Sequence, residues 1–349
     1  MLKKVFTNGG LLIGSIVFFT LTIEFGLRLT GLQTVKPRPP QIYLSSKNPS
    51  ISYTLKPNIN TKAFRSTVTT DENGFRVNET SSFHSAPENV EEIEKQKIGK
   101  PNIAVLGDSI TFGYGVENYQ TLPARLEELI PDYHFINTGV PGYFLSQEIA
   151  LYNKITRKMD PEALILVFYW NDLNDFNPGV LDEQGILRTA DWKPEDKPCD
   201  PITEGILGYI PGKCWLDTHS AFYMAFKKAV NMVHNNRILD ATREEASAGE
   251  LADPVDMKNL EVYIEQLTNF TETLPIDHYF VIWPDRFVHT DSKAELIKAA
   301  KKLEYIVIDL SEIFGNSAPT LGWDTVHPNA QTIEKAAEYI RDAVEKGSL

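Results

Sequence analysis

Short apolar runs alternate with amphipathic stretches from residue 102 onward, and this alternation predicts strands that alternate with helices. The predicted strands cover residues 103–106, 135–137, 163–170, 278–283 and 305–309. The predicted helices cover residues 122–130, 147–159, 257–273, 293–303 and 330–346. Short connections between such elements favour a parallel sheet with helices on both faces.

The alternation stops between residues 177 and 254, a stretch rich in Pro and Gly with one amphipathic segment at 221–239. Ligands bind at the carboxyl ends of the strands in open α/β sheets. We therefore interpret 177–254 as an insertion over that edge, where it forms a lid or one wall of a pocket. Its aromatic residues either form a small core of the insertion or contact acyl chains; they are Trp192, Tyr209, Trp215, Phe222 and Tyr223.

The N-terminus carries a different pattern, an uncharged apolar run over residues 9–23 that follows two lysines. Apolar residues continue to Leu32 around Glu24 and Arg28, which are four apart and can pair on one helix face. A spanning helix needs about 20 apolar residues, and lysines before it favour a cytoplasmic N-terminus. The pattern predicts an uncleaved signal-anchor. A cleaved signal peptide and a buried helix of a cytoplasmic protein are the alternatives.

The patterns together predict three parts of the chain. Residues 1–32 form a cytoplasmic tip and a transmembrane helix, residues 33–100 a linker and N-terminal extension, and residues 101–349 the α/β domain with its insertion. The linker begins with the Pro-rich sequence KPRPPQ, which is typical of an extended spacer. In the strand-like region 51–77, the sequence ENGFR (Glu72–Arg76) contains an Asn-Gly pair that indicates a tight turn.

Composition and charge exclude some function classes. Hydrophobic residues make up 42% of the 349 residues, which is ordinary for a globular protein. The formal net charge of −13 and the lack of a long basic run argue against a nucleic-acid partner. No Cys-x-x-Cys metal spacing occurs. In an oxidising compartment we expect Cys199 and Cys214 to form a disulfide, with two free thiols as the alternative.

Candidate catalytic residues follow a predicted strand or precede a predicted helix. In VLGDSITFGYG, an apolar strand leads into Ser109, where backbone N–H groups favour developing negative charge. In DTVHPN, before the last helix, His327 is a candidate base for a serine nucleophile, and Asp324 lies three residues earlier to orient its ring. Taken alone, either motif is also compatible with a helix cap or a loop histidine.

Two further motifs follow strands at the same sheet edge. Gly142 in FINTGVPGY can present an open N–H to a ligand. Asn171 in FYWNDLND offers a side-chain amide suited to binding an oxyanion. Turn chemistry explains either motif alone, but four such groups at one edge indicate one pocket. The remaining histidines lie in no convincing motif and are interpreted as structural or surface residues: His84, His134, His219, His234, His278 and His289.

This set of motifs resembles the SGNH/GDSL hydrolase family over residues 101–345. The family's four blocks are similar, in order, to Gly107-Asp108-Ser109, Asn137 through Gly142, Asn171-Asp172, and Asp324 through His327. The resemblance implies a flavodoxin-like three-layer α/β/α fold with a parallel sheet, and ester hydrolysis without a metal or an organic cofactor. No Gly-x-Ser-x-Gly motif occurs, which argues against an α/β-hydrolase fold.

The resemblance also implies a role for each site residue. Ser109 attacks the carbonyl, His327 acts as base and then as acid, and Asp324 orients His327. The backbone amides of Ser109 and Gly142 and the side-chain amide of Asn171 bind the oxyanion.

Three features of the sequence bear on how far the resemblance extends. Tyr169 stands where the third block usually has Gly, and we expect it to narrow the acyl pocket and favour small acyl groups. Ile110 replaces the Leu of the family name, a conservative apolar exchange. ENGFR resembles a segment often found ahead of this domain in exported bacterial relatives, and its role stays open.

We therefore expect a membrane-anchored serine esterase in the periplasm or extracellular space. It would cleave small-acyl esters, above all acetyl esters, on a small molecule or a glycan. The glycan expectation comes from the compartment and not from pocket residues. The open alternatives are an O-acyltransferase with the same triad, a lipase or lysophospholipase, and an inactive glycan-binding or assembly protein. The sequence leaves the oligomeric state open.

Overall fold

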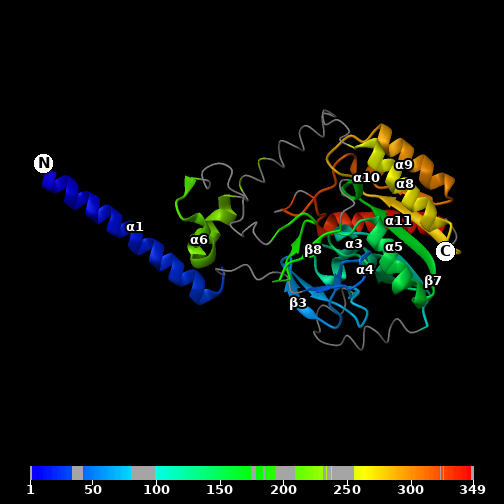
Figure 1. Cartoon of the computed structure of the whole chain (residues 1–349), viewed down its shortest axis with the longest axis horizontal. Helices are drawn as coiled ribbons and strands as arrows, with labels where there is room; N and C mark the ends of the chain where they lie inside the picture. Colours follow the sequence, from blue (N-terminus) through cyan, green and yellow to red (C-terminus); the bar gives the residue numbers. More distant parts are fainter. Residues whose placement is uncertain are drawn as a thin grey trace. The chain divides into compact units, whose positions relative to one another are not determined.

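The computed structural model describes residues 2–33, 42–79, 99–173, 178–183, 185–193, 209–230, 233, 237, 255–322, 324 and 326–346 (Figure 1). The chain divides into two compact units, which are described separately. One comprises residues 1–39 and 193–237, and the other comprises residues 40–192 and 238–349. The first unit thus combines the N-terminal helix with residues from the middle of the 177–254 insertion.

A five-stranded parallel sheet forms the centre of the larger unit, in the order β11-β10-β7-β5-β6. Its strands are β5 (Asn102–Leu106), β6 (His134–Asn137), β7 (Pro161–Phe168), β10 (Asp277–Ile282) and β11 (Ile306–Asp309). Numbered along the chain, these strands lie in the flavodoxin-like order 2-1-3-4-5, and the order reverses between β5 and β7. The predicted flavodoxin-like fold is therefore confirmed.

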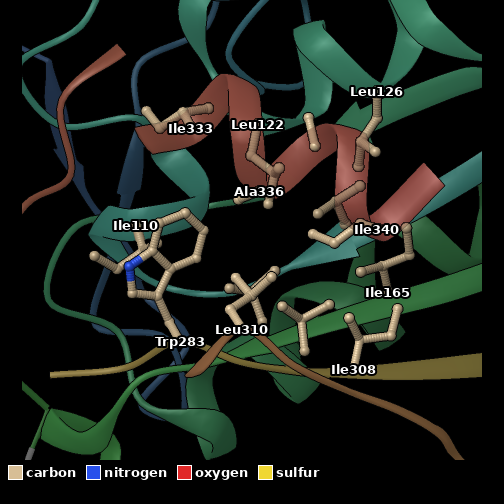
Figure 2. Close-up of a cluster of buried hydrophobic side chains, with 14 of the residues drawn as sticks. Ile110, Leu122, Leu126, Ile165, Trp283, Ile308, Leu310, Ile333, Ala336 and Ile340 are labelled. Carbon is tan, nitrogen blue, oxygen red and sulfur yellow. The ribbon is translucent and has the colours of Figure 1, made fainter. Parts of the chain in front are cut away.

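Helices cover both faces of this sheet. Helices α4 (Leu122–Leu129) and α11 (Ala330–Lys346) bury their apolar stripes against one face. Figure 2 shows Ile333, Ala336 and Ile340 of α11 in this core, with Leu122 and Leu126 of α4. Helices α5 (Leu145–Lys154), α8 (Met257–Thr271) and α9 (Asp291–Lys302) cover the other face. Successive strand residues alternate between the two cores, as pleated strands require.

The predicted elements agree with the structure except near their ends. Helix α11 has the predicted bounds. The predicted helix 147–159 divides into α5 and the short helix η2 (Thr156–Met159). Pro161, expected to close that helix, is the first residue of β7, a position where its missing N–H costs no ladder hydrogen bond.

The N-terminal extension forms two small antiparallel sheets, as its strand-like pattern predicts. Strand β1 (Tyr43–Ser45) pairs with β2 (Tyr53–Leu55), and β3 (Asn60–Ala63) pairs with β4 (Ser66–Thr69). The expected ENGFR turn is present. The Gly74 N–H donates to the Asp71 carbonyl, and the backbone of Gly74 has a φ of +83°. A Cβ at Gly74 would lie 2.6 Å from the Leu55 carbonyl oxygen, so only glycine fits. The extension shares one hydrophobic core with the α/β domain.

The described part of the 177–254 insertion lies in both units. The hairpin of β8 (Val180–Leu181) and β9 (Leu187–Arg188) belongs to the larger unit, and α6 (Lys213–His219) belongs to the smaller one. A second helical stretch covers residues 221–230. The proposed disulfide falls outside the described residues, because Cys199 and the side chain of Cys214 are not among them.

The smaller unit contains α1 (Leu2–Thr30), whose segment Asn8–Thr30 is long and apolar enough to cross a membrane. The expected pair forms between Arg28 and Glu24, at 2.6 Å. The Glu24 carboxylate also accepts the backbone N–H groups of Ala221 and Phe222, at 2.9 and 2.7 Å. It therefore caps the helix at 221–230, and this contact explains why that part of the insertion groups with α1.

Two of the insertion's five aromatic residues do not form the small core considered for them. Tyr209 and Trp215 are 88% and 61% exposed, whereas Tyr223 is buried.

Candidate active site

Ser109 is the first residue of the short helix α3 (Ser109–Phe112), directly after β5 and at the point where the strand order reverses. Asp108 caps this helix by accepting the Ile110 N–H at 2.8 Å. Gly107 makes the turn into it at a φ of +152°, where a Cβ would lie 2.2 Å from Thr111 Oγ1. The nucleophile candidate is thus held at a tight strand-to-helix turn and is 7% exposed.

His327 lies within hydrogen-bond distance of both of its predicted partners. Its Nε2 is 3.0 Å from Ser109 Oγ, across 218 positions of sequence, and its Nδ1 is 2.9 Å from Asp324 Oδ2. The other Asp324 oxygen accepts the backbone N–H groups of Val326 and His327, at 2.7 and 2.8 Å. These bonds fix the carboxylate and the ring in one orientation, so the geometry is that of a Ser–His–Asp relay.

The pKa of Asp324 is set by opposing effects. Burial raises it, but the hydrogen bond and charge of His327 and the backbone N–H groups of His327 and Val326 lower it. The lowering effects dominate, so the pKa lies below its ordinary value of 3.8. Asp324 is therefore ionised at neutral pH and available to orient His327.

This shift predicts a pH-dependent stability. Because the folded-state pKa is depressed, charged Asp324 stabilises the fold fully above about pH 3.8, and the contribution is lost as pH falls through the folded-state pKa. The difference in free energy of unfolding between the wild type and Asp324→Asn should shrink as the pH is lowered from 6 to about 3. Urea unfolding of the full chain measures it, with exposed Asp132→Asn as the control. A difference that grows on acidification contradicts the assignment.

Asn171 lies in η3 (Trp170–Leu173), directly after β7. Its Nδ2 donates to Asp108 Oδ2 at 3.0 Å, and Ser109 Oγ lies 3.2 Å from the same oxygen. The structure thus brings Asn171 beside Ser109, with an amide proton directed at Asp108. A second proton on Nδ2 remains to bind a ligand oxygen.

Gly142 lies in the loop between β6 and α5, at a φ of +83° and exposed to solvent. A Cβ at this position would lie 2.9 Å from the Tyr53 hydroxyl oxygen. The same hydroxyl donates to the Pro141 carbonyl at 2.9 Å, and the Val140 N–H donates to the Gly107 carbonyl at 3.3 Å. These bonds connect the Gly142 loop both to the extension and to the nucleophile turn.

An aromatic ring stacks on the candidate base, a contact that no sequence pattern indicates. The Tyr114 ring lies parallel to the His327 ring, with centroids 3.9 Å apart and planes inclined by 20°. Phe64, from the turn between β3 and β4, packs on Tyr114 at 4.2 Å. Tyr114 stands between Gly113 and Gly115 in the loop that follows Ser109. The stack restricts tilting of the imidazole and brings the extension to the active site.

Arg76, the last residue of ENGFR, holds the segment 112–118, which follows Ser109, through hydrogen bonds. It is 2% exposed, and its guanidinium donates to the carbonyl oxygens of Thr67, Phe112, Gly113 and Val116 and to Asn118 Oδ1, at 2.6–2.9 Å. It also lies 4.7 Å from the centroid of the Phe112 ring. Burial lowers the pKa of Arg76 to about 9, although Glu117 and Glu79 raise it, so the group is charged at neutral pH. The motif thus fixes the C-terminal end of α3.

A pocket of about 420 Å³ opens beside Asn171, a volume suited to a small organic ligand. Val326, next to His327, also lines it. The remaining lining residues follow β7 and β10 or begin α8: Tyr169, Trp170, Leu173, Val255, Asp256, Asn259, Asp285, Arg286, Phe287 and His289. Among the described residues, no group of three His, Cys, Asp or Glu side chains could hold a metal ion.

No family model and no curated protein matches the chain. The chain is similar to solved GDSL-family and esterase structures. One is a member of the lipolytic protein G-D-S-L family from Veillonella parvula, at 14% identity and a TM-score of 0.36, covering 70% of this chain and 98% of that one. Another is the esterase EstA from Pseudoalteromonas sp., at 11% identity and a TM-score of 0.39, covering 71% and 98%.

A third similar structure is a two-domain esterase active on acetylated mannans, at 13% identity and a TM-score of 0.39, covering 73% of this chain and 52% of that one. In each case the likeness is one of fold. The strand order and the distances among Ser109, His327 and Asp324 are properties of this chain, and they carry the functional argument.

Proposed function

We propose that this chain is a serine ester hydrolase of the SGNH/GDSL type, with Ser109 as nucleophile. The observation that carries the proposal is the continuous relay from Ser109 Oγ to His327 Nε2, and from His327 Nδ1 to Asp324 Oδ2. A serine hydroxyl becomes an effective nucleophile when a positioned base takes its proton, and the base needs a carboxylate to fix its tautomer.

The reaction proceeds in two halves. Ser109 Oγ bonds to the acyl carbon while its proton passes to His327 Nε2, and the Nδ1–H stays bonded to Asp324. The imidazolium then gives its proton to the leaving alcohol, which departs and leaves an acyl-enzyme. Water gives a proton to His327 Nε2 as its oxygen bonds to the acyl carbon. The bond between that carbon and Ser109 Oγ then breaks, His327 returns the proton to Oγ, and the acid leaves. No step in this scheme requires a metal or an organic cofactor.

Three donors are assigned to the oxyanion of each tetrahedral intermediate. They are the backbone N–H of Ser109, the backbone N–H of Gly142, and the second Nδ2 proton of Asn171. The Asp108 carboxylate supports this assignment because it accepts both the side-chain amide of Asn171 and the backbone N–H of Ile110, which follows Ser109. Such preorganised donors supply a large part of the rate enhancement in acyl transfer.

The preferred substrate is a small-acyl ester, above all an acetyl ester, on a glycan or a related small molecule. Tyr169, in the position where a glycine would leave more space, is almost fully buried and lines the pocket. Its bulk supports a short acyl group. Transfer of the acyl group to a sugar hydroxyl uses the same acyl-enzyme, so the acceptor has to be measured directly.

The N-terminal helix α1 is assigned as a signal-anchor that leaves the catalytic unit outside the cytoplasm. Two charged side chains, Glu24 and Arg28, lie near the end of α1. They pair with each other, and Glu24 also accepts a backbone N–H of the insertion. Such paired charges are compatible with a position at the membrane interface. Protease added outside intact cells or spheroplasts should cleave the chain after residue 33. Full protection of the chain from that protease would contradict this orientation.

One experiment tests the function. The full chain in detergent is incubated with an acetylated oligosaccharide, with and without a free oligosaccharide acceptor, and released acetate and acetylated acceptor are both quantified. Acetate release supports the hydrolase, and transfer in excess of release identifies an acyltransferase instead. If neither product forms from acetyl esters, longer-chain acyl esters or phospholipids, that result contradicts catalysis by this site.

The aromatic stack predicts a kinetic effect. Tyr114→Leu should lower kcat roughly 10- to 100-fold with little change in KM, because a base that tilts away from Ser109 loses the aligned geometry. Tyr114→Phe keeps the ring and should retain most of the activity. Initial-rate measurements on a soluble acetyl ester separate kcat from KM. Full kcat in the leucine variant would show that the stack does not position His327.

A further inference from the structure

Arg286 is a cation on the wall of the pocket beside Asn171. Its side chain is half-buried, and its guanidinium lies 5.1 Å from the centroid of the Phe287 ring. It makes no hydrogen bond and no ion pair with any residue that the structure describes. A half-buried guanidinium has five N–H donors, so this pocket retains unused capacity to bind an acceptor.

The two carboxylates in the same pocket are already engaged. Asp285 Oδ1 accepts the Phe287 N–H at 2.8 Å and lies 2.8 Å from His289 Nε2. The His289 ring in turn stacks on Trp170, with centroids 3.4 Å apart. Asp256 caps helix α8 by accepting the Lys258 N–H at 2.9 Å. These partners leave Arg286 as the charged group of the pocket without a counterion among the described residues.

Arg286 lines the same pocket as Asn171 and as Val326, the residue before His327. Burial raises the pKa of Tyr169, and the charges that also act on its hydroxyl are those of Asp285, Asp108, Arg286 and Asp324. A ligand that fills this pocket is therefore bordered both by Arg286 and by Asn171, whose amide is bonded to Asp108 next to Ser109.

We propose that Arg286 binds a carboxylate on the alcohol part of the substrate, so that the preferred substrate is a small-acyl ester of an acidic sugar. A guanidinium matches a carboxylate through two parallel hydrogen bonds. The chain as a whole carries a formal charge of −13, which repels anions. Recognition of an acidic sugar therefore requires a local cation, and Arg286 supplies it. This inference rests on the proposed esterase function.

Matched substrates test the inference. Rates of deacetylation are measured for O-acetyl glucuronate and O-acetyl glucose, which differ in one carboxylate, with the full chain in detergent. The wild type should prefer the acidic ester in kcat/KM, mainly through a lower KM. Arg286→Gln should reduce this preference about 10- to 100-fold, the range expected for a charged hydrogen bond. Arg341→Gln, which removes a cation from the exposed face of α11, should leave the preference unchanged.

Product binding keeps the inference testable without catalysis. Calorimetry should detect glucuronate binding to the wild type and a loss of that binding in Arg286→Gln. The inference is overturned if the two esters are hydrolysed at equal rates, or if glucuronate still binds to Arg286→Gln. Hydrolysis of acetyl glucose would in either case still support the esterase function. A preference for sulfated or phosphorylated sugars overturns the carboxylate assignment. Absence of all hydrolysis contradicts the proposed function, and calorimetry then decides the Arg286 site separately.

Discussion

Replacing Ser109 with alanine should lower kcat for ester hydrolysis by about 10⁴- to 10⁶-fold. The relay has a single nucleophilic oxygen, Ser109 Oγ, which lies 3.0 Å from His327 Nε2, and alanine leaves the base with no proton to take. Steady-state rates with a soluble acetyl ester, supplemented by product detection over long incubations, measure this loss.

The controls for this prediction separate chemistry from folding. Ser50→Ala, an exposed serine of the N-terminal extension, should keep full activity. Ser109→Ala should keep a near-wild-type Tm, because the change removes one hydroxyl and opens no large cavity. The double variant Ser109→Ala with His327→Ala should be no slower than the single variant, since residues that act as one unit are not additive. Activity within tenfold of the wild type would exclude Ser109 as nucleophile.

The second large effect concerns stability. Arg76→Met should lower the free energy of unfolding of the larger unit by about 4–5 kcal/mol, since several buried acceptors lose their donor at once and each unsatisfied one costs about 1–3 kcal/mol. Urea unfolding of the full chain, followed by tryptophan fluorescence, measures the change.

A matched variant sharpens this second prediction. Arg76→Lys keeps the charge but provides three donors in place of five, so it should recover only part of the lost stability. The carbonyls of Phe112 and Gly113 belong to the end of the nucleophile helix, so reduced kcat should accompany the reduced stability. A loss below about 1 kcal/mol in Arg76→Met would show that water satisfies these carbonyls and that the motif does not anchor the loop.

The fold and the four motif positions could be predicted because they depend on local patterns. Buried parallel strands appear as short apolar runs, and the runs that become β5 and β7 are followed by Gly107 and by Asn171 at the carboxyl edge of the sheet. Ser109 and Asn171 follow neighbouring strands, β5 and β7, so sheet topology alone brings them close together. The pairing of Asp324 with His327 follows from their spacing of three residues.

The remaining features depend on contacts between distant segments, which no local pattern reveals. Phe64 reaches Tyr114 only through the fold of the extension. Glu24 was correctly paired with Arg28, but its contact with the Ala221 N–H spans 197 positions. No local pattern indicates that residues 193–237 group in one compact unit with the N-terminal helix. The motif ENGFR was noticed, yet the carbonyl partners of Arg76 carry no sequence signature.

The most direct test of the central claim is active-site labelling. The full chain is treated with a fluorophosphonate, and the modified residue is mapped by mass spectrometry in the wild type, in His327→Ala and in Ser109→Ala. We expect one label on Ser109, much slower labelling in His327→Ala, and none in Ser109→Ala. A label on another serine, or labelling of Ser109 at the same rate without His327, would contradict it.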